Sequence, residues 1–315
     1  MAETSETITV AGLTKRFANV TAVDHLSFGV GRAEIFGLVG PDGAGKTTTL
    51  RMLAGVLAPD EGSARVAGED VVQRPEAVKG RISYMPQRFG LYDDLTVDEN
   101  IRFYADLFGL SRATREAHAT RLLAASGMQE FRRRLAGQLS GGMKQKLGLT
   151  CALIHTPTVL LLDEPTTGVD PISRRDFWRI LYSLLAEGVT VLIATSYLDE
   201  AERCHRLGLL YGGRLLLCDT PGQLKNRLAA QVVVVTSPAA RAVRDHLAHA
   251  EGVSSLMLVG DGVHLVVDDA ARRIPELQSQ LRAAALPFDQ IAHVPPTVED
   301  LFVSSVQGQA GGADD

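Results

Sequence analysis

The sequence predicts an α/β fold built around a parallel β-sheet, with a smaller α+β appendix after it. Apolar segments of strand length alternate with helical patterns between residues 34 and 210, which is typical of a parallel sheet covered on both faces. Beyond Leu228 the composition shifts to Ala and Val in shorter segments. We therefore expect a core domain at residues 1–227, an accessory domain at 228–306 and a disordered tail at 307–315.

The bulk composition narrows the class of protein. The chain has 315 residues, 45% hydrophobic and 22% charged, which suits two soluble globular domains. A net charge of −5 argues against broad binding to nucleic acid, because such binding requires a basic face. Three widely spaced cysteines without a CxxC pair indicate neither disulfides nor zinc, and predict a reducing, cytosolic compartment. The sequence predicts neither a signal peptide nor a spanning helix, so we expect a partner to provide any attachment to a membrane.

The core domain begins with short predicted strands. Those at Ile8–Val10 and Leu26–Val30 have turn residues between them, which indicates an antiparallel β meander. An apolar strand at residues 34–40 then leads into a Gly-rich loop. The spacing of apolar residues predicts a helix over residues 46–57, so this segment reads as strand, loop and helix.

A helical subdomain is expected over about residues 88–150. The apolar positions between residues 98 and 129 fit helices that are broken at Gly109 and Gly127. The core domain then continues with predicted strands at 159–163, 189–194 and 207–210 and a helix at 171–186. The accessory domain is predicted to contain a strand at 232–236, a helix at 239–249, a hairpin at 253–267 and a helix at 274–285.

The Gly-rich loop matches the phosphate-binding pattern of P-loop NTPases, in the strand-to-helix context that this motif requires. Its glycines let backbone amides face phosphates, Lys46 reaches the β- and γ-phosphates, and Thr47 offers a hydroxyl to Mg²⁺. The alternative is a Gly-rich turn that happens to precede a lysine. The predicted nucleotide-binding residues of this loop are Gly40, Pro41, Asp42, Gly43, Ala44, Gly45, Lys46, Thr47 and Thr48.

Two acids end the predicted strand at residues 159–163, at the carboxyl edge of the sheet where ligands of such folds bind. Asp163 is placed to hold Mg²⁺ through water, and Glu164 to orient or deprotonate the attacking water. The alternative is a buried strand that ends in solvated acids. The phosphate-binding loop favours the catalytic interpretation.

A third motif, LSGG at residues 139–142, begins a predicted helix. Ser140 and the amides of Gly141 and Gly142 form an anion-binding nest that could hold a γ-phosphate, with a plain helix cap as the alternative. With this motif the sequence resembles the ATP-binding cassette, the nucleotide-binding subunit of ABC transporters, whose signature is LSGG. The resemblance covers about residues 7–225.

Further residues follow the pattern of that family. Gln87 matches its Q-loop glutamine, which contacts Mg²⁺ and the membrane partner, and residues 167–170 resemble its D-loop. Phe17 sits where the family places an aromatic ring against adenine, with a core phenylalanine at a strand end as the alternative. Ser196 stands where the family usually has a histidine. A serine can still form a hydrogen bond to a γ-phosphate, but its side chain is shorter than that of histidine and cannot become cationic. We therefore expect slow ATP hydrolysis.

The resemblance implies a function and its partners. It implies ATP and Mg²⁺ as ligands, with Glu164, Gln87 and Ser196 in catalysis and Thr47, Gln87 and Asp163 at the metal. It also implies a head-to-tail dimer with a second cassette, identical or different, in which Lys46 and Glu164 of one face Ser140 of the other. Residues 88–96 and 295–302 are similar to cassettes of bacterial multidrug-type ABC-2 exporters. These work on the inner face of the cell membrane through a separate transmembrane permease subunit.

Two other classes remain open on the sequence. One is a cassette ATPase of translation or DNA repair, although the acidic charge and the single phosphate loop argue against nucleic acid as a partner. The other is an ATP-gated structural subunit with little hydrolysis of its own, which the serine at position 196 favours. Magnesium-dependent turnover separates this second class from a working ATPase.

Overall fold

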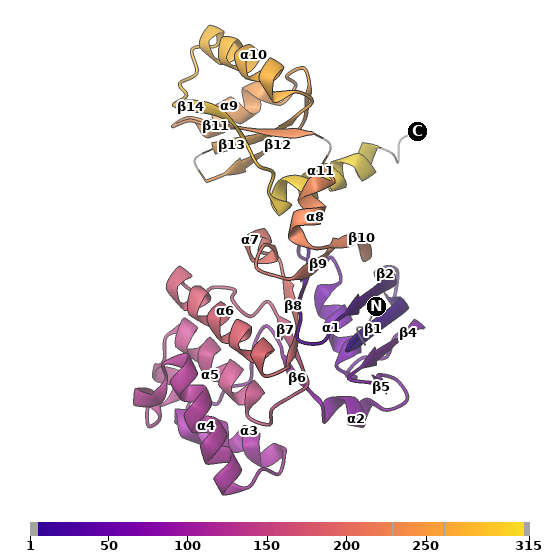
Figure 1. The fold of residues 1–315 in the computed structure, drawn as a ribbon, viewed down its shortest axis with the longest axis vertical. Coiled ribbons are helices and arrows are strands. Elements are labelled where there is room, and N and C mark those ends of the chain that lie inside the picture. Colours follow the sequence, from indigo (N-terminus) through magenta and orange to yellow (C-terminus); the bar gives the residue numbers. More distant parts are fainter. Residues whose placement is uncertain (1–5, 229, 261, 312–315) are drawn as a thin grey trace. The chain divides into compact units, whose positions relative to one another are not determined.

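The structure is a computed structural model that describes residues 6–228, 230–260 and 262–311 (Figure 1). The chain divides into two compact units, and the division falls after Cys218. The sequence places a boundary after residue 227. Helix α8 (Pro221–Asn226) therefore lies in the second unit, where it packs on helix α11 (Val298–Gly311).

A six-stranded sheet forms the centre of the first unit, in the order β10-β9-β3-β8-β7-β6. Its strands are β3 (Ile35–Val39), β6 (Ile82–Met85), β7 (Val159–Asp163), β8 (Thr190–Thr195), β9 (Arg206–Tyr211) and β10 (Arg214–Asp219). Pairing is parallel from β9 to β6, which confirms the predicted parallel sheet, although the pattern predicts neither β6 nor β10. Because parallel strands end at one edge, the residues that follow β3, β6, β7 and β8 meet there.

A second sheet of this unit is antiparallel, in the order β2-β1-β4-β5. Its strands are β1 (Ile8–Phe17), β2 (Val20–Val30), β4 (Glu61–Val66) and β5 (Glu69–Asp70). The two short strands predicted for the meander are the paired ends of β1 and β2, with Ile8 opposite Val30. The predicted meander is confirmed, and its strands are longer than the sequence pattern indicates.

The helices of the first unit include the predicted helical subdomain. They are α1 (Lys46–Leu53), α2 (Pro75–Lys79), α3 (Val97–Leu107), α4 (Arg112–Ser126), α5 (Gly141–Leu153), α6 (Pro171–Ala186) and α7 (Leu198–Ala201), with short 3₁₀ helices at Gln129–Phe131 and Ala136–Gln138. A capping box between Thr96 and Glu99 begins α3, and Gly127 with φ 66° ends α4 as predicted. Helix α1 is shorter than predicted, because Gly55 with φ 65° turns the chain soon after Leu53.

Side chains of the parallel sheet alternate between two buried clusters. In β7, Leu160 and Leu162 belong to a cluster with the buried side chains of α5 and α6. Leu161, between them, belongs to a cluster with α1 and the antiparallel sheet. Both faces of the sheet are therefore covered, which explains why its strands are apolar throughout.

The three cysteines form no disulfide. Cys151 and Cys204 are buried, and burial raises the pKa of both thiols because the charged thiolate is poorly solvated there. These two side chains therefore act as small apolar core residues with low reactivity.

The second unit contains a four-stranded antiparallel sheet in the order β12-β13-β11-β14. In addition to α8 and α11, its elements are β11 (Gln231–Thr236), α9 (Ala240–Leu247), β12 (Val253–Val259), β13 (Gly262–Val267), α10 (Ala270–Ala283) and β14 (Gln290–Val294). The succession β-α-β-β-α-β and this strand order are those of a ferredoxin-like α+β unit. The predicted strand, helix, hairpin and helix are present.

The C-terminal part of this unit differs from the prediction. The sequence pattern does not predict β14, whose five residues precede a Pro-Pro pair. The predicted disordered tail begins at residue 307, whereas α11 continues to Gly311. The backbone of the first part of that tail is therefore helical, and residues 312–315 lie outside the described part of the chain.

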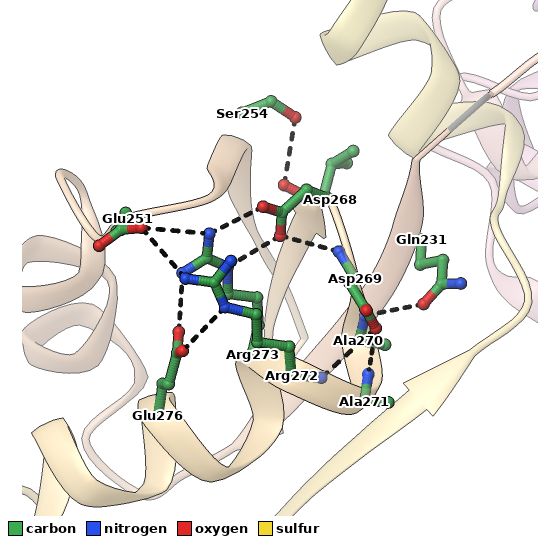
Figure 2. Close-up of polar contacts among 11 residues, drawn as sticks. Gln231, Glu251, Ser254, Asp268, Asp269, Ala270, Ala271, Arg272, Arg273 and Glu276 are labelled. Carbon is green, nitrogen blue, oxygen red and sulfur yellow. Dashed lines mark hydrogen bonds and ion pairs between the residues drawn. The ribbon is translucent and has the colours of Figure 1, made fainter.

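Arg273 is the centre of an ion-pair cluster in the second unit (Figure 2). Although only 3% of this residue is exposed, its guanidinium donates to both carboxylate oxygens of Asp268, at 2.8 and 2.7 Å, and to Glu276 at 2.7 Å. A Cβ atom at Gly252 would lie 2.1 Å from Arg273 Nε, so only glycine fits beside this side chain. The hydrogen bonds from Arg273 hold the pKa of Asp268 well below its usual range.

This lowered pKa makes the stability of the second unit depend on pH. A carboxyl with a lowered pKa stabilises the folded state above its unfolded pKa of about 3.9, and this contribution is lost as the pH falls. We expect Asp268→Asn to weaken hydrogen-exchange protection of the β11–β14 amides at pH 7, and to do so somewhat less at pH 3, because the contribution declines from the unfolded pKa down to the much lower folded-state pKa. Asp289 is exposed, so Asp289→Asn is the control and should leave hydrogen-exchange protection unchanged at either pH. Equal weakening by Asp268→Asn at both pH values would contradict this interpretation.

Candidate active site

The phosphate-binding loop joins β3 to α1, as the sequence predicts. Gly45 precedes the first helical residue with φ 100°, and a Cβ atom there would lie 2.3 Å from the carbonyl oxygen of Ala22. A Cβ at Gly40 would lie 2.1 Å from the carbonyl oxygen of Leu210. Glycine is therefore required at both positions. The loop wraps the N-terminus of α1, whose free amides attract anions.

Lys46 lies inside this loop with only 5% of its surface exposed, so it is not a surface cation. Its ammonium donates to the carbonyl oxygens of Gly40 and Pro41, at 2.7 and 3.0 Å. It also forms an ion pair with Glu164 Oε1 at 3.1 Å. The cation is thus fixed between the loop and the acid that follows β7.

Oxygen ligands suited to Mg²⁺ meet beside the loop. The Thr47 hydroxyl lies 2.9 Å from the buried carboxylate of Asp163. The Tyr84 hydroxyl donates to the other oxygen of Asp163 at 3.2 Å. Burial, and then the charge of Asp163, raise the pKa of Tyr84 to about 12, so this phenol stays a donor. The sequence motifs give Tyr84 no role, because its contact depends on the alignment of β6 with β7.

Glu164 has a strained backbone conformation. Its φ of 48° is a left-handed conformation that side-chain-bearing residues rarely adopt. Its Oε2 accepts from the hydroxyls of Ser196 at 3.2 Å and Thr167 at 3.4 Å. Its Oε1 is buried and, apart from the ion pair with Lys46, accepts no hydrogen bond from the described residues. A buried carboxylate oxygen that lacks a hydrogen-bond donor can accept a hydrogen bond from water.

The structure places Gln87 and Phe17 at the periphery. Gln87 is exposed and follows β6, whose last residue Met85 pairs with Leu162, so it lies at the same sheet edge as Asp163. No hydrogen bond joins it to the acids within the described residues. Phe17 is 47% exposed at the end of β1, which excludes a core phenylalanine. Its ring lies 5.6 Å from Lys15 Nζ.

The LSGG motif begins α5 in the helical subdomain, as predicted. Ser140 is its N-cap and accepts from the Met143 amide at 3.3 Å, while Ser140 and Gly141 are exposed. A Cβ at Gly142 would lie 2.3 Å from the hydroxyl of Ser173 in α6. Within the part of the chain that is described, no polar contact joins this motif to Lys46 or Glu164. The structure thus brings together the start of α1 and the residues that follow β7 and β8, and the LSGG motif makes no polar contact with them in the described residues.

An apolar cavity of about 250 Å³ lies between β6 and the helical subdomain. Tyr84, which contacts Asp163, is one of its lining residues. Three of the others are large apolar side chains exposed by 44% to 65%, namely Val56, Leu107 and Phe108. Exposed apolar side chains around a hollow are typical of a protein interaction site. No helix in the described residues has both the length and the apolar character to cross a membrane.

Sequence comparisons find relatives over nearly the whole chain. The family described as ABC transporter matches residues 23–167. The Nod factor export ATP-binding protein I of Paraburkholderia xenovorans is 39% identical over 92% of this chain and 93% of its own length. The "Probable multidrug ABC transporter ATP-binding protein YbhF" of Escherichia coli is 44% identical over 96% of this chain and 52% of its own length. The chain thus spans about half the length of that relative and of its Shigella flexneri counterpart.

Solved structures share the fold of about 70% of this chain. One described as the ATP binding subunit of an ABC transporter has a TM-score of 0.64 and 29% identity, and covers 70% of this chain and 92% of its own. A nucleotide-free ATP-binding cassette from an ABC transporter has a TM-score of 0.62 at 24% identity, over 71% of this chain and 95% of its own. The second likeness concerns the fold alone.

Proposed function

Because this chain belongs to the ATP-binding cassette family of ABC transporter ATPases, we propose that it powers an exporter of the multidrug ABC-2 type. Family membership makes it an ATP-binding subunit and an ATPase. Two points support this type of exporter. Residues 88–96 are similar to the same segment of multidrug-type ABC-2 cassettes, and relatives of the chain are named as multidrug and Nod factor export proteins. The observation that carries the proposal is the convergence of Lys46, Thr47, Asp163 and Glu164 at one sheet edge.

Residues of this chain would hold ATP and Mg²⁺. The donor set fits, because the Thr47 hydroxyl and the Asp163 carboxylate are oxygen ligands 2.9 Å apart at a helix N-terminus. Residues 40–48 would bind the phosphates, Phe17 would stack on adenine, and Gln87 would complete the metal site. Mg²⁺ would neutralise part of the negative charge on the phosphates.

Glu164 and Ser196 would act in the hydrolysis of ATP. In the proposed hydrolysis, water attacks the γ-phosphorus, the bond to the β-phosphate oxygen breaks, and Glu164 accepts the proton of the water. Its Oε1 is the oxygen available for this step, since Oε2 already accepts from Ser196. Ser196 orients the carboxylate and, being exposed, can also reach a γ-phosphate.

We place a second cassette across this site. Ser140 to Gly142 are on the helical subdomain and make no polar contact with the Lys46 loop in the described residues, so a second chain would present its own LSGG motif to the nucleotide. ATP then joins the two cassettes and hydrolysis releases them. The second cassette is another copy of this chain or a different one.

The cavity beside β6 is the proposed docking site for a transmembrane permease subunit. Such a subunit would hold the chain at the inner face of the cell membrane. Tyr84 lines the cavity and also bonds Asp163, so the two sites share one side chain. Movement at the nucleotide would thereby reach the permease.

A substitution on this surface tests the docking. We expect Leu107→Asp, at a side chain that is 65% exposed, to weaken co-purification with the permease about tenfold or more, because it buries an unpaired charge. Affinity for ATP should not change. Val72→Asp, at a side chain 51% exposed outside the cavity lining, is the matched control. Normal co-purification of Leu107→Asp would move the docking site elsewhere.

Transport itself tests the proposed function. We would prepare inside-out vesicles that contain the chain and its permease, and measure ATP-dependent uptake of ethidium. Uptake that requires ATP and disappears with Glu164→Gln supports multidrug export. Undiminished uptake with that variant would contradict the proposal that this chain supplies the energy.

The residue at position 196 is proposed to set the rate of ATP hydrolysis. A histidine there would add a ring donor toward the γ-phosphate, and one such donor is worth about 2.7 to 4 kcal/mol in other enzymes. The serine already bonds Glu164, so we expect Ser196→His to raise kcat by only about tenfold at unchanged ATP affinity. Ser196→Ala is the control and should lower kcat. Unchanged or lower turnover of Ser196→His would show that the serine is sufficient.

A further inference from the structure

Glu200 in α7 is a completely buried carboxylate, with 0% of its surface exposed. A buried charge is costly unless donors and a counter-charge compensate it. Four side chains do so. Its Oε1 accepts from Thr166 at 2.5 Å, from Trp178 Nε1 at 3.2 Å and from Arg174 at 3.2 Å, and its Oε2 accepts from Thr195 at 2.9 Å.

Two of these donors belong to the segments that carry the proposed catalytic residues. Thr166 lies two positions after Glu164, in the turn beyond β7. Thr195 is the last residue of β8 and directly precedes Ser196. One carboxylate therefore joins the two turns in which Glu164 and Ser196 face each other at 3.2 Å.

The other two donors fix Glu200 to α6. Trp178 is itself buried, and Arg174 supplies the counter-charge. Arg174 also pairs with the exposed Asp199 at 3.2 Å and lies 4.6 Å from the ring of Tyr197. The carboxylate of Glu200 is thus fixed on one side by a rigid helix and on the other by the two turns.

We propose that Glu200 is a positioning residue that keeps Glu164 and Ser196 at the distance and orientation needed for ATP hydrolysis. This inference rests on the roles proposed above for those two residues. Glu200 itself is completely buried, so it would act through the residues that it holds. Its effect is geometric, because a small misplacement of reacting groups slows a reaction much more than it weakens binding.

The neutral isostere Glu200→Gln tests this role in the purified full chain. It keeps the shape of the side chain but turns one acceptor oxygen into a donor, so it cannot accept from both threonines and Arg174. We expect kcat to fall about tenfold or more, with KM for ATP changed less than about twofold. Asp199→Asn also removes an acid beside Arg174 but keeps Glu200, and it should leave kcat unchanged.

A second pair of variants keeps the test valid if Glu200→Gln folds poorly. Thr195→Val removes one donor to Glu200 at nearly constant volume, and it should lower kcat several-fold. Thr195→Ser keeps that hydroxyl and should retain more turnover than Thr195→Val. A wild-type kcat per folded chain in either Glu200→Gln or Thr195→Val, even with a lower melting temperature, would overturn the positioning role.

Glu164→Gln, measured in parallel, separates this inference from the proposed function. If Glu164→Gln abolishes turnover and Glu200→Gln does not lower it, only the positioning role fails. If Glu164→Gln keeps its turnover, the proposed chemistry fails, and the inference built on it fails too.

Discussion

Glu164→Gln is expected to bind ATP as tightly as the wild-type chain and to hydrolyse it about 10² to 10⁴ times more slowly. The glutamine side chain of the variant has nearly the same volume and still accepts the hydrogen bond from Ser196, but it cannot accept a proton from water. Phosphate release under saturating Mg-ATP gives kcat, and equilibrium binding of a fluorescent ATP analogue gives the affinity. A fall in kcat with unchanged affinity is the signature of a lost general base.

Glu130→Gln is the matched control for that variant. The chemical change is the same, but Glu130 is exposed in a short 3₁₀ helix of the helical subdomain. Its turnover should equal that of the wild-type chain. If Glu164→Gln also turned over normally, Glu164 would not be the base.

Lys46→Ala is expected to weaken ATP binding about tenfold to hundredfold and to abolish measurable hydrolysis. A hydrogen bond to a charged group contributes about 1.5 to 3 kcal/mol, and Lys46 is the cation that the loop holds for the phosphates. Direct titration of nucleotide binding by calorimetry measures the loss.

The burial of Lys46 makes a stability control necessary. Its removal leaves Glu164 without its counter-charge at 3.1 Å, so the variant is expected to melt at a lower temperature. Lys46→Ala combined with Glu164→Gln removes both charges and should recover part of that stability without recovering ATP binding. Normal ATP affinity in either variant would contradict the role of Lys46.

The sequence could predict the parts of the site that depend on local pattern. The phosphate-binding loop requires glycine at fixed positions, and Gly45 meets that requirement with its φ of 100°. The placement of Asp163, Glu164 and Ser196 at one edge follows from the rule that parallel strands end together. The meeting of these side chains at one sheet edge is therefore predictable from the sequence.

Contacts between distant segments could not be predicted in this way. Tyr84 reaches Asp163 only because β6 aligns with β7, and Glu200 reaches Thr166 only because α7 packs against the turn after β7. Neither alignment leaves a periodic signal in the sequence. The short strand β14 is similar, since its place is fixed by pairing with β11 rather than by its own pattern.

The mass of the Glu164→Gln chain, together with any cassette that co-purifies with it, tests most directly whether ATP closes two cassettes on one another. Mass photometry with saturating Mg-ATP, and again with Mg-ADP, provides this measurement. We expect the mass of two cassettes with ATP and of one cassette with ADP. A single cassette with ATP fully bound would contradict the proposed closure.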